Sequence, residues 1–417
     1  MKLNTDVKLN AEEQAWLDGR SGAAMELAMR MLVAAAGATG ATEFVPVEMA
    51  HINSCHYSGQ LSLDFAEFLL SNQAALAVPT HTNASLISCT SPDLRPVAMS
   101  PTEVAGATRL MEIYEQLGCS QMWSCAPYQQ DDGRPTFGQH VIGSESNAVS
   151  FFNSVLGART NKYGDLLDVA GAITGRVPLT GLHSDAGRLA THLFRLDIDT
   201  LDDPTLPHLL GVVLGEQAGS NIPVLDGLAT ADEDSLKAIA AAGATSGAVE
   251  MFHVVGVTPE ADTIEDATGG RTPQHETVID TQMLRDARKR LSRGNSTLRS
   301  VCLGTPHYSE REFERLRLSL AGRTVHERIS FLVTTSRATF AVLQLRGWDD
   351  EFSSLGVRIV TDTCSYYTPH ATGVESLVMT DSAKWAYYAP GILDVDVRFG
   401  SLTDCVESAI AGEVIVT

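Results

Sequence analysis

The chain has 417 residues, of which 44% are hydrophobic and 19% charged, a composition typical of a globular protein with two or three domains. Its formal net charge of −21 argues against a nucleic-acid partner and against an anionic membrane surface, because both require basic protein surface. The longest apolar stretch, around residues 31–36, is too short to span a bilayer, and the N-terminal MKLNTDVKLNAEEQ lacks the apolar core of a secretory signal, so we expect a cytoplasmic protein.

Helix signals and strand signals alternate along the chain. Capping boxes at residues 100–103 and 309–312 are expected to open helices that end near Gly118 and Leu320. Further helices are predicted at residues 12–18, 23–36, 235–242, 281–291, 337–345 and 402–409. Strand-like runs occur at residues 44–47, 121–124, 252–257, 331–334 and 357–360. This alternation predicts an α/β fold with largely parallel sheets.

We expect three α/β domains, at about residues 1–120, 121–260 and 261–417. The first carries the HINSCHY segment, the second carries Cys125 with the SESNA and GARTN segments, and the third carries Cys302 and Cys364. The polar stretch at residues 259–277 is punctuated by Gly and Pro, which predicts a surface loop or a domain connection.

Three of the seven cysteines share a local setting. Cys125, Cys302 and Cys364 each follow a strand-like run and precede a turn rich in Pro, His or aromatic residues. Ligand sites in open α/β sheets form at the carboxyl ends of strands, and three thiolates gathered there could hold an iron–sulfur cluster or zinc. No CxxC occurs, so the residues alone favour a simpler interpretation, in which the three are buried thiols that pack as small hydrophobic groups. The remaining cysteines are expected to be structural: Cys55, Cys89, Cys119 and Cys405.

Polar residues gather in several other segments with little apolar periodicity to explain them. The candidates for catalysis are His51, Ser54, Tyr57, Glu145 and Lys384. The candidates for substrate binding are Asn147, Asn153, Arg159, Thr160, Asn161 and Arg176. Helix caps and ordinary surface polarity explain the same patterns without any function.

Eight stretches follow one another along the chain: MAHINSCHYSG, WSCAPY, ESNAVSFFNSVLGARTNKYGD, AITGRVP, FHVVGVTPEA, VCLGTPHYS, VTDTC and MTDSAKWAYYAPG. In this order and spacing they resemble the large, catalytic subunit of the aconitase X family over nearly the whole chain. The resemblance implies an aconitase-like fold around a central iron–sulfur site, of the [4Fe–4S] or [2Fe–2S] type. It also implies that the cluster ligands lie in the WSCAPY, CLGTPH and TDTC segments, at Cys125, Cys302 and Cys364.

The activity implied by the resemblance is that of a hydro-lyase acting on a small hydroxy acid. Bacterial members of the family dehydrate cis-3-hydroxy-L-proline to 1-pyrroline-2-carboxylate, and archaeal members dehydrate 5-phosphomevalonate. The stretches NSVLGARTNKYGD and DTCSYY look closer to the bacterial branch. Aconitase-type enzymes also use a small swivelling domain, so the resemblance implies a separate small subunit as partner, which could carry the general base.

Three alternatives stay open at this point. The same fold could act on 5-phosphomevalonate, although a phosphate needs a denser cluster of cationic donors than a proline carboxylate does. The chain could instead be a non-catalytic iron–sulfur protein with a regulatory or binding role. It could also be a zinc hydrolase on cysteine ligands, and visible iron–sulfur absorption would exclude that class.

Overall fold

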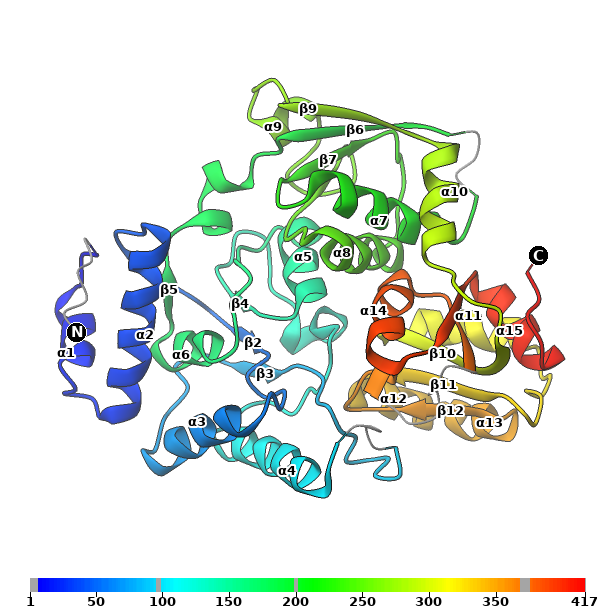
Figure 1. Ribbon diagram of the computed structural model, residues 1–417. Helices are drawn as coiled ribbons and strands as arrows, with labels where there is room; N and C mark the ends of the chain where they lie inside the picture. Colours follow the sequence, from blue (N-terminus) through cyan, green and yellow to red (C-terminus); the bar gives the residue numbers. More distant parts are fainter. Residues whose placement is uncertain (1–6, 95–98, 199–201, 368–375, 417) are drawn as a thin grey trace.

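The structure is a computed structural model that describes residues 7–94, 99–198, 202–367 and 376–416 (Figure 1). These residues form three parallel sheets and one antiparallel ribbon, β1 (Phe44–Pro46) with β5 (Arg176–Pro178). Helices cover the sheets, so the predicted α/β fold with largely parallel sheets is confirmed. No helix in the described part of the chain has both the length and the apolar character that a bilayer crossing demands.

The N-terminal sheet has the strand order β3-β2-β4. Its strands are β3 (Thr80–Thr82), β2 (Ala50–Ile52) and β4 (Ile142–Gly143). The helices of this part of the chain are α1 (Ala11–Leu17), α2 (Ala23–Thr39), α3 (Gln60–Ser71), α4 (Pro101–Gln116), α5 (Ser146–Ser154) and α6 (Leu167–Thr174). At the start of α4 the Ser100 hydroxyl accepts a hydrogen bond from the Glu103 amide, and the Glu103 carboxylate accepts one from the Ser100 amide. This reciprocal capping stabilises the first turn, as the sequence predicts.

The middle sheet has the strand order β8-β7-β6-β9. Its strands are β8 (His253–Val254), β7 (Pro223–Asp226), β6 (His192–Asp197) and β9 (His275–Asp280). Its helices are α7 (Leu206–Ala218), α8 (Glu233–Gly247), α9 (Ile264–Thr268) and α10 (Thr281–Arg290). Helices α7 and α8 pack backbone to backbone, because a Cβ atom added to Gly247 would lie 1.7 Å from the carbonyl oxygen of Gly215. Only glycine permits this approach.

The C-terminal sheet has the strand order β12-β11-β10-β13-β14, all parallel. Its strands are β10 (Thr297–Tyr308), β11 (Ser330–Thr335), β12 (Val357–Val360), β13 (Ser376–Thr380) and β14 (Asp396–Phe399). Its helices are α11 (Glu310–Leu320), α12 (Arg337–Leu345), α13 (Trp348–Ser354), α14 (Ala383–Leu393) and α15 (Leu402–Ala411). Short 3-10 turns lie at Pro127–Gln129, Asp131–Gly133, Gly181–His183, Asp185–Arg188 and Ser365–Tyr367.

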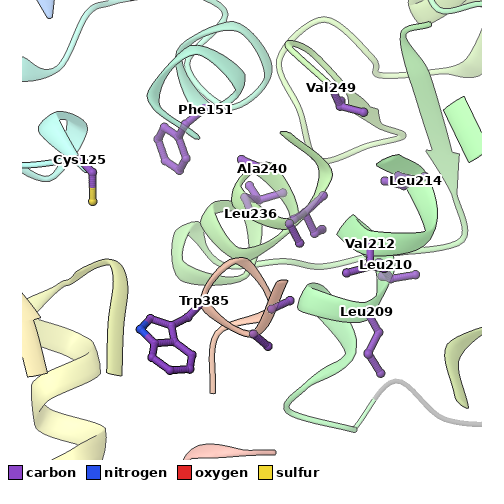
Figure 2. Packing of buried hydrophobic residues seen from close by; sticks show 14 of the residues in the cluster. Cys125, Phe151, Leu209, Leu210, Val212, Leu214, Leu236, Ala240, Val249 and Trp385 are labelled. Atoms are coloured by element: carbon purple, nitrogen blue, oxygen red, sulfur yellow. The ribbon is translucent and has the colours of Figure 1, made fainter. Parts of the chain in front are cut away.

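One hydrophobic core connects the middle and C-terminal sheets with residues near the N-terminal sheet. Figure 2 shows Phe151 of α5, Leu236 of α8 and Trp385 of α14 in this core, with Cys125 at its side. Cys302 and Cys364 belong to the same core. The three predicted ligand cysteines therefore lie in one buried region of the fold.

The predicted helices are all present, with ends that shift by a few residues. Two strand predictions differ from the structure. Residues 121–124 form no strand, because Trp123 has a φ of +43° and the segment turns there. In the run at 252–257 only His253–Val254 is a strand, because Gly256 has a φ of +71° and the chain turns back through Thr258.

Two positions of the sequence-based interpretation also need correction. Cys302 does not follow a strand but lies inside β10, which continues to Tyr308. The stretch at 259–277 is not all loop, because it contains α9 and the beginning of β9.

The sheets cross the divisions expected at 120/121 and 260/261. Strand β4, at residues 142–143, pairs with β2, and β9, at residues 275–280, pairs with β6. Local sequence signals carry no information on pairing between distant strands. The domain boundaries themselves stay a prediction.

Candidate functional site

Three side chains with metal-binding atoms converge in the buried core. The sulfur atoms of Cys125 and Cys364 and a ring nitrogen of His307 all lie within 4.8 Å of one another. Cys125 follows the turn at Trp123, His307 lies near the end of β10, and Cys364 follows β12. Thiolates and imidazole are ligands that suit iron and zinc, so this group could bind a metal.

The imidazole of His307 connects the two segments that carry the cysteines. Its Nδ1 is 3.1 Å from the Ser124 hydroxyl, and its Nε2 is 3.0 Å from the carbonyl oxygen of Thr363. The His307 amide also donates to the sulfur of Cys125, at 3.3 Å. These contacts fix the positions of both thiols relative to β10.

The two thiols differ in acidity. A hydrogen bond from the Cys364 thiol lowers the pKa of Cys125 to about 6, against the burial that raises it, and the nearby His307 and Lys384 lower it further. The same hydrogen bond, together with burial, raises the pKa of Cys364. The pair therefore favours the thiolate on Cys125 over that on Cys364, and the thiolate is the form that ligates metal.

Asp362 holds the segment that carries Cys364. It is fully buried, has a φ of +73°, and binds the Arg337 guanidinium through both carboxylate oxygens, at 2.6 and 3.0 Å. The Cys89 amide donates to the same carboxylate, at 3.0 Å, and the Ser85 amide donates to the Asp362 carbonyl oxygen, at 2.6 Å. This segment is thus tied to the N-terminal part of the chain as well as to α12.

A cavity of about 340 Å³ opens beside Cys125 and Cys364. Its lining combines amides, hydroxyls, charged groups and aromatic rings. The residues that line it are Asn53, His56, Asn83, Ala84, Cys125, Ser144, Glu145, Ser146, Lys162, Cys364, Tyr366, Lys384, Tyr388 and Ile392. Such a polar hollow next to buried thiolates is the strongest candidate for a substrate site in the described chain.

Two predicted catalytic residues, Glu145 and Lys384, meet in this cavity as a buried ion pair. Glu145 is the N-cap of α5, and its Oε2 accepts from the Ala148 amide at 2.7 Å. Burial by itself lowers the pKa of Lys384, but the Glu145 carboxylate outweighs burial and raises it, so the lysine stays charged. The pair holds the Lys384 ammonium in a fixed position next to the thiols.

The predicted residues of the HINSCHY segment lie behind the cavity. His51 is fully buried, and its Nε2 is 2.9 Å from the Ser124 carbonyl oxygen; burial lowers its pKa to about 4. Ser54 donates to the buried carboxylate of Asp168, and Tyr57 packs against Gly106 of α4. None of these three is among the residues that line the cavity. His51 contacts the segment of Cys125, while Ser54 helps to fix the loop that presents Asn53.

Of the predicted substrate-binding residues, Asn147 lies nearest to the thiols. Its Nδ2 donates to the Cys125 carbonyl oxygen at 3.1 Å and to the Tyr128 hydroxyl at 2.9 Å. The Asn153 Nδ2 donates to the Thr160 carbonyl oxygen at 2.8 Å. The Asn153 Oδ1 accepts from the Thr160 amide at 3.0 Å and from the Arg188 guanidinium at 3.1 Å. Both amides are therefore engaged within the protein.

The other predicted substrate-binding residues also have protein partners and lie outside the cavity lining. Arg159 pairs with Asp185, and the Thr160 hydroxyl accepts from the Gly143 amide at 2.9 Å. Asn161 donates to the Thr180 carbonyl oxygen at 3.0 Å. Arg176 lies beside α1, 3.5 Å from Glu13 and over the ring of Trp16.

Cys302 lies outside the group of three converging residues. It is fully buried in β10, and burial raises its pKa to about 12, although a hydrogen bond with Ser365 lowers it in part. Ser365 is the neighbour of Cys364 in the chain, so Cys302 is close to the site. Its role as the third ligand stays a prediction.

Several site residues were not singled out from the sequence. His307 lies in the stretch VCLGTPHYS, and its proximity to Cys302 was an available signal. Asn53 and His56 belong to the HINSCHY segment but were not chosen from it. Asn83 and Lys162 carry no local signal, because they reach the cavity only through the packing of distant segments.

Family models match nearly the whole chain. They are described as the first, second and third domains of aconitase X, and they match residues 6–186, 190–289 and 298–411. Among solved structures, the holo form of aconitase X from Thermococcus kodakaraensis superimposes with a TM-score of 0.85 at 26% identity, covering 97% of this chain and 100% of that one.

Curated relatives carry two different names. A cis-3-hydroxy-L-proline dehydratase from Pseudomonas aeruginosa is 40% identical over 98% of this chain and 71% of the relative, and one from Hypocrea jecorina is 37% identical over 98% and 70%. A phosphomevalonate dehydratase large subunit from Methanothermobacter thermautotrophicus is 32% identical over 94% of this chain and 96% of the relative.

Proposed function

The chain belongs to the aconitase X family, and on that premise we propose that it is the catalytic subunit of a hydro-lyase that dehydrates cis-3-hydroxy-L-proline to 1-pyrroline-2-carboxylate. The observation that carries the proposal is the cavity that holds Cys125, Cys364 and the Glu145–Lys384 pair in a chain 40% identical to a named cis-3-hydroxy-L-proline dehydratase. The reaction removes the proton next to the carboxylate and the hydroxyl on the neighbouring ring carbon as water, and the ring enamine so formed tautomerises to the imine 1-pyrroline-2-carboxylate.

The charges of the cavity favour a small monocarboxylate over a phosphate ester. Among the described lining residues, the permanently cationic ones are Lys162 and Lys384, and no arginine is present. Lys384 is already paired with Glu145. A phosphate dianion is usually held by several cationic or backbone donors, whereas one lysine suffices for a carboxylate.

The sulfur atoms of the site fit an iron–sulfur cluster, of the [4Fe–4S] or [2Fe–2S] type. The pKa of Cys125 is lowered, which favours its thiolate, and Cys364 converges on it, with Cys302 in the same core as the proposed third ligand. When bound, the cluster would supply a Lewis acid for the leaving hydroxyl. The hydrophobic core behind the cysteines, with Trp385 and Phe151, excludes water from that side.

Lys384 and Lys162 are the proposed contacts of the substrate carboxylate. Glu145 is the one carboxylate among the described residues of the lining, and both its oxygens are engaged, by Lys384 and by the Ala148 amide. We therefore assign Glu145 the task of fixing the Lys384 ammonium. The base that removes the proton is proposed to lie on the partner that covers the cavity.

Helix α14 offers a surface for that partner. Tyr387, Tyr388 and Ile392 are 49%, 37% and 50% exposed, and the latter two also line the cavity mouth. Relatives named phosphomevalonate dehydratase large subunits match this chain over 94–98% of their length, and their name implies a further subunit. We propose that a small subunit packs on this aromatic edge and closes the cavity of a cytoplasmic enzyme. An Ile392→Glu variant should then lose the small subunit in co-purification, whereas Leu345→Glu, at an 88% exposed position on α12, should retain it. Retention by both variants would refute this surface.

A second candidate substrate is 5-phosphomevalonate. It is favoured by the relatives named phosphomevalonate dehydratase large subunits, which are 27–32% identical to this chain. A non-catalytic iron–sulfur protein is the alternative of another class, and the polar cavity beside the thiols argues against it.

The test is a dehydration assay on the anaerobically purified holoenzyme, co-expressed with its small subunit. We expect 1-pyrroline-2-carboxylate from cis-3-hydroxy-L-proline, no turnover of 5-phosphomevalonate, and visible absorption of an iron–sulfur cluster. Turnover of phosphomevalonate alone would replace the proposed substrate. A cluster-bearing complex without activity on either compound would overturn the proposal as a whole.

A further inference from the structure

A chain of three side chains runs from the surface to the edge of the cavity. The Asn53 Nδ2 donates to the Asp165 carboxylate at 2.8 Å, and the Asn83 Nδ2 donates to the Asn53 Oδ1 at 2.7 Å. Asn53 and Asn83 follow β2 and β3, which are neighbouring parallel strands of the N-terminal sheet. Both asparagines line the cavity with Cys125 and Cys364.

The direction of this chain is fixed by chemistry and does not depend on how the amides were oriented. An ionised carboxylate can only accept hydrogen bonds, so the NH₂ group of Asn53 must face Asp165. The oxygen of Asn53 then faces Asn83 and must receive an N–H from it. The Oδ1 of Asn83 is the end of the chain, and it is an acceptor.

That terminal acceptor has no partner. The Asn83 side chain is buried, with a 7% exposed fraction for the residue, and its Oδ1 has no hydrogen-bond partner among the described residues. Buried polar atoms are nearly always paired in native proteins, and an unpaired one beside a cavity indicates a ligand that supplies the missing group. An acceptor requires a ligand with an N–H or O–H donor.

The charge distribution selects the kind of donor. Hydrogen bonds in a chain polarise one another, so the negative charge of Asp165 strengthens the Asn83 oxygen as an acceptor through Asn53. Glu145, the one carboxylate of the described lining, is already paired with Lys384. A cationic N–H donor that enters the cavity thus finds the Asn83 oxygen as a buried acceptor without a competing partner.

We propose that the Asn83 Oδ1 accepts a hydrogen bond from the ring ammonium of the substrate and so selects a secondary amino acid over a nitrogen-free hydroxy acid. This inference rests on the proposed function. It makes Asn83 a specificity-determining residue, while Asn53 and Asp165 are positioning residues that hold its amide in the accepting orientation. The proposed contact of the carboxylate is Lys384, and the cluster proposed on the cysteines would act on the hydroxyl. A nitrogen-free analogue carries both of these groups.

The test compares two ligands on the holoenzyme with its small subunit. One is cis-3-hydroxy-L-proline, and the other is its carbocyclic analogue, cis-2-hydroxycyclopentane-1-carboxylate, which lacks the ring nitrogen. Wild type should bind the amino acid roughly 10- to 100-fold more tightly than the carbocycle, as expected for a hydrogen bond to a charged donor. In Asn83→Leu this preference should vanish, through a rise in KM for the amino acid and an unchanged inhibition constant for the carbocycle.

The controls separate this role from a structural one. Asn83→Ala is the second variant should Asn83→Leu fail to fold, and Asn72→Leu, on an exposed helix end, should leave both ligands unaffected. Equal weakening of both ligands, or a preserved preference in a folded Asn83 variant, would overturn the inference. Absence of any wild-type turnover of cis-3-hydroxy-L-proline would instead refute the proposed function, and the wild-type enzyme alone is sufficient for that measurement.

Discussion

The buried ion pair of Lys384 and Glu145 allows a quantitative prediction. The Lys384 side chain is 8% exposed and that of Glu145 is 9% exposed, so replacing Lys384 by Met leaves a buried carboxylate that keeps the Ala148 amide but loses its counter-charge. Removal of one member of a buried pair costs about 3–5 kcal/mol. We expect Lys384→Met to lower the free energy of unfolding by about that amount. Adding Glu145→Gln should restore a large part of it, because no unpaired charge then remains.

The assay is urea unfolding followed by tryptophan fluorescence, to which the buried Trp385 of α14 contributes. The measurement belongs at pH 8. The pKa of Lys384 is raised in the folded protein, so the contribution of the pair is fully present below the ordinary lysine pKa, about 10.4. It is lost only as the pH rises through the higher folded value.

A matched control is available in the pair of Lys237 and Glu312, whose side chains are 4% and 14% exposed. Lys237→Met should destabilise the protein to a similar extent, yet it should retain dehydratase activity after correction for folded protein, because it lies outside the cavity lining. Lys384→Met should lose activity as well as stability. A Lys384→Met variant that unfolds within about 1 kcal/mol of wild type would refute the reasoning, because the pair would then contribute no more than an exposed one.

Three further predictions concern the cluster, the pH dependence and the loop behind the cavity. Cys125→Ala should abolish visible iron–sulfur absorption, whereas Cys405→Ala, on the buried face of α15, should keep it; equal spectra would exclude Cys125 as a ligand. Burial raises the pKa of Asp381 to about 7, above its ordinary value, so its protonated form favours folding below about pH 4 and that contribution disappears as the pH rises through 7. Asp381→Asn should therefore stabilise the protein at pH 8. In wild type, the ionisation of Asp381 should lower the free energy of unfolding by up to about 1.4 kcal/mol per pH unit between pH 4 and 7, and the variant should lack this contribution. Urea titrations at several pH values measure both effects. Asp168 accepts from both Ser54 and Ser144, so Asp168→Asn should cost about 2–4 kcal/mol in the same assay; a neutral effect would contradict its role as the anchor of the loop.

The sequence predicts the helices well because their signals are local. The capping boxes before α4 and α11 act within four residues, and each is formed as expected. The strands are predicted less well where pairing decides them. Gly304 and Pro306 look like strand breakers, yet β10 continues past both, because β11 pairs with it up to Leu303 and again at Tyr308, across a register shift. For this reason Cys302 was expected after a strand and is found inside one.

Residues of the candidate site could be predicted from the sequence only where a local sequence pattern marked them. The surroundings in the sequence single out Cys125 and Cys364, and both line the cavity. Unexplained polarity singles out Glu145, and the start of a predicted helix that could bind an anion singles out Lys384; these two also line the cavity. Arg159 and Arg176 were chosen for their chemistry, but arginine is equally common in ordinary ion pairs, such as the one between Arg159 and Asp185. Side-chain type alone does not separate these two uses.

Asn83 illustrates why the rest could not be predicted. Its importance comes from the order of the hydrogen bonds in the chain from Asp165 through Asn53, and these residues are 30 to 112 positions apart in the sequence. An asparagine in an extended segment after a short strand has no local feature that marks it as an orphaned acceptor. Only the pairing of β2 with β3, together with the docking of the loop before α6, creates that state.

The relative position of the two thiols also depends on contacts between segments that are far apart in the sequence. Cys125 and Cys364 are brought together by His307, which bonds to Ser124 on one side and to Thr363 on the other. A CxxC motif sets part of its sulfur geometry within one turn of chain, whereas here each thiol comes from a different segment of the fold. Cluster binding should therefore require the N-terminal and C-terminal parts of the chain to be docked, and any variant that loosens the contact of Asp362 with Arg337 should weaken cluster retention without touching a sulfur atom.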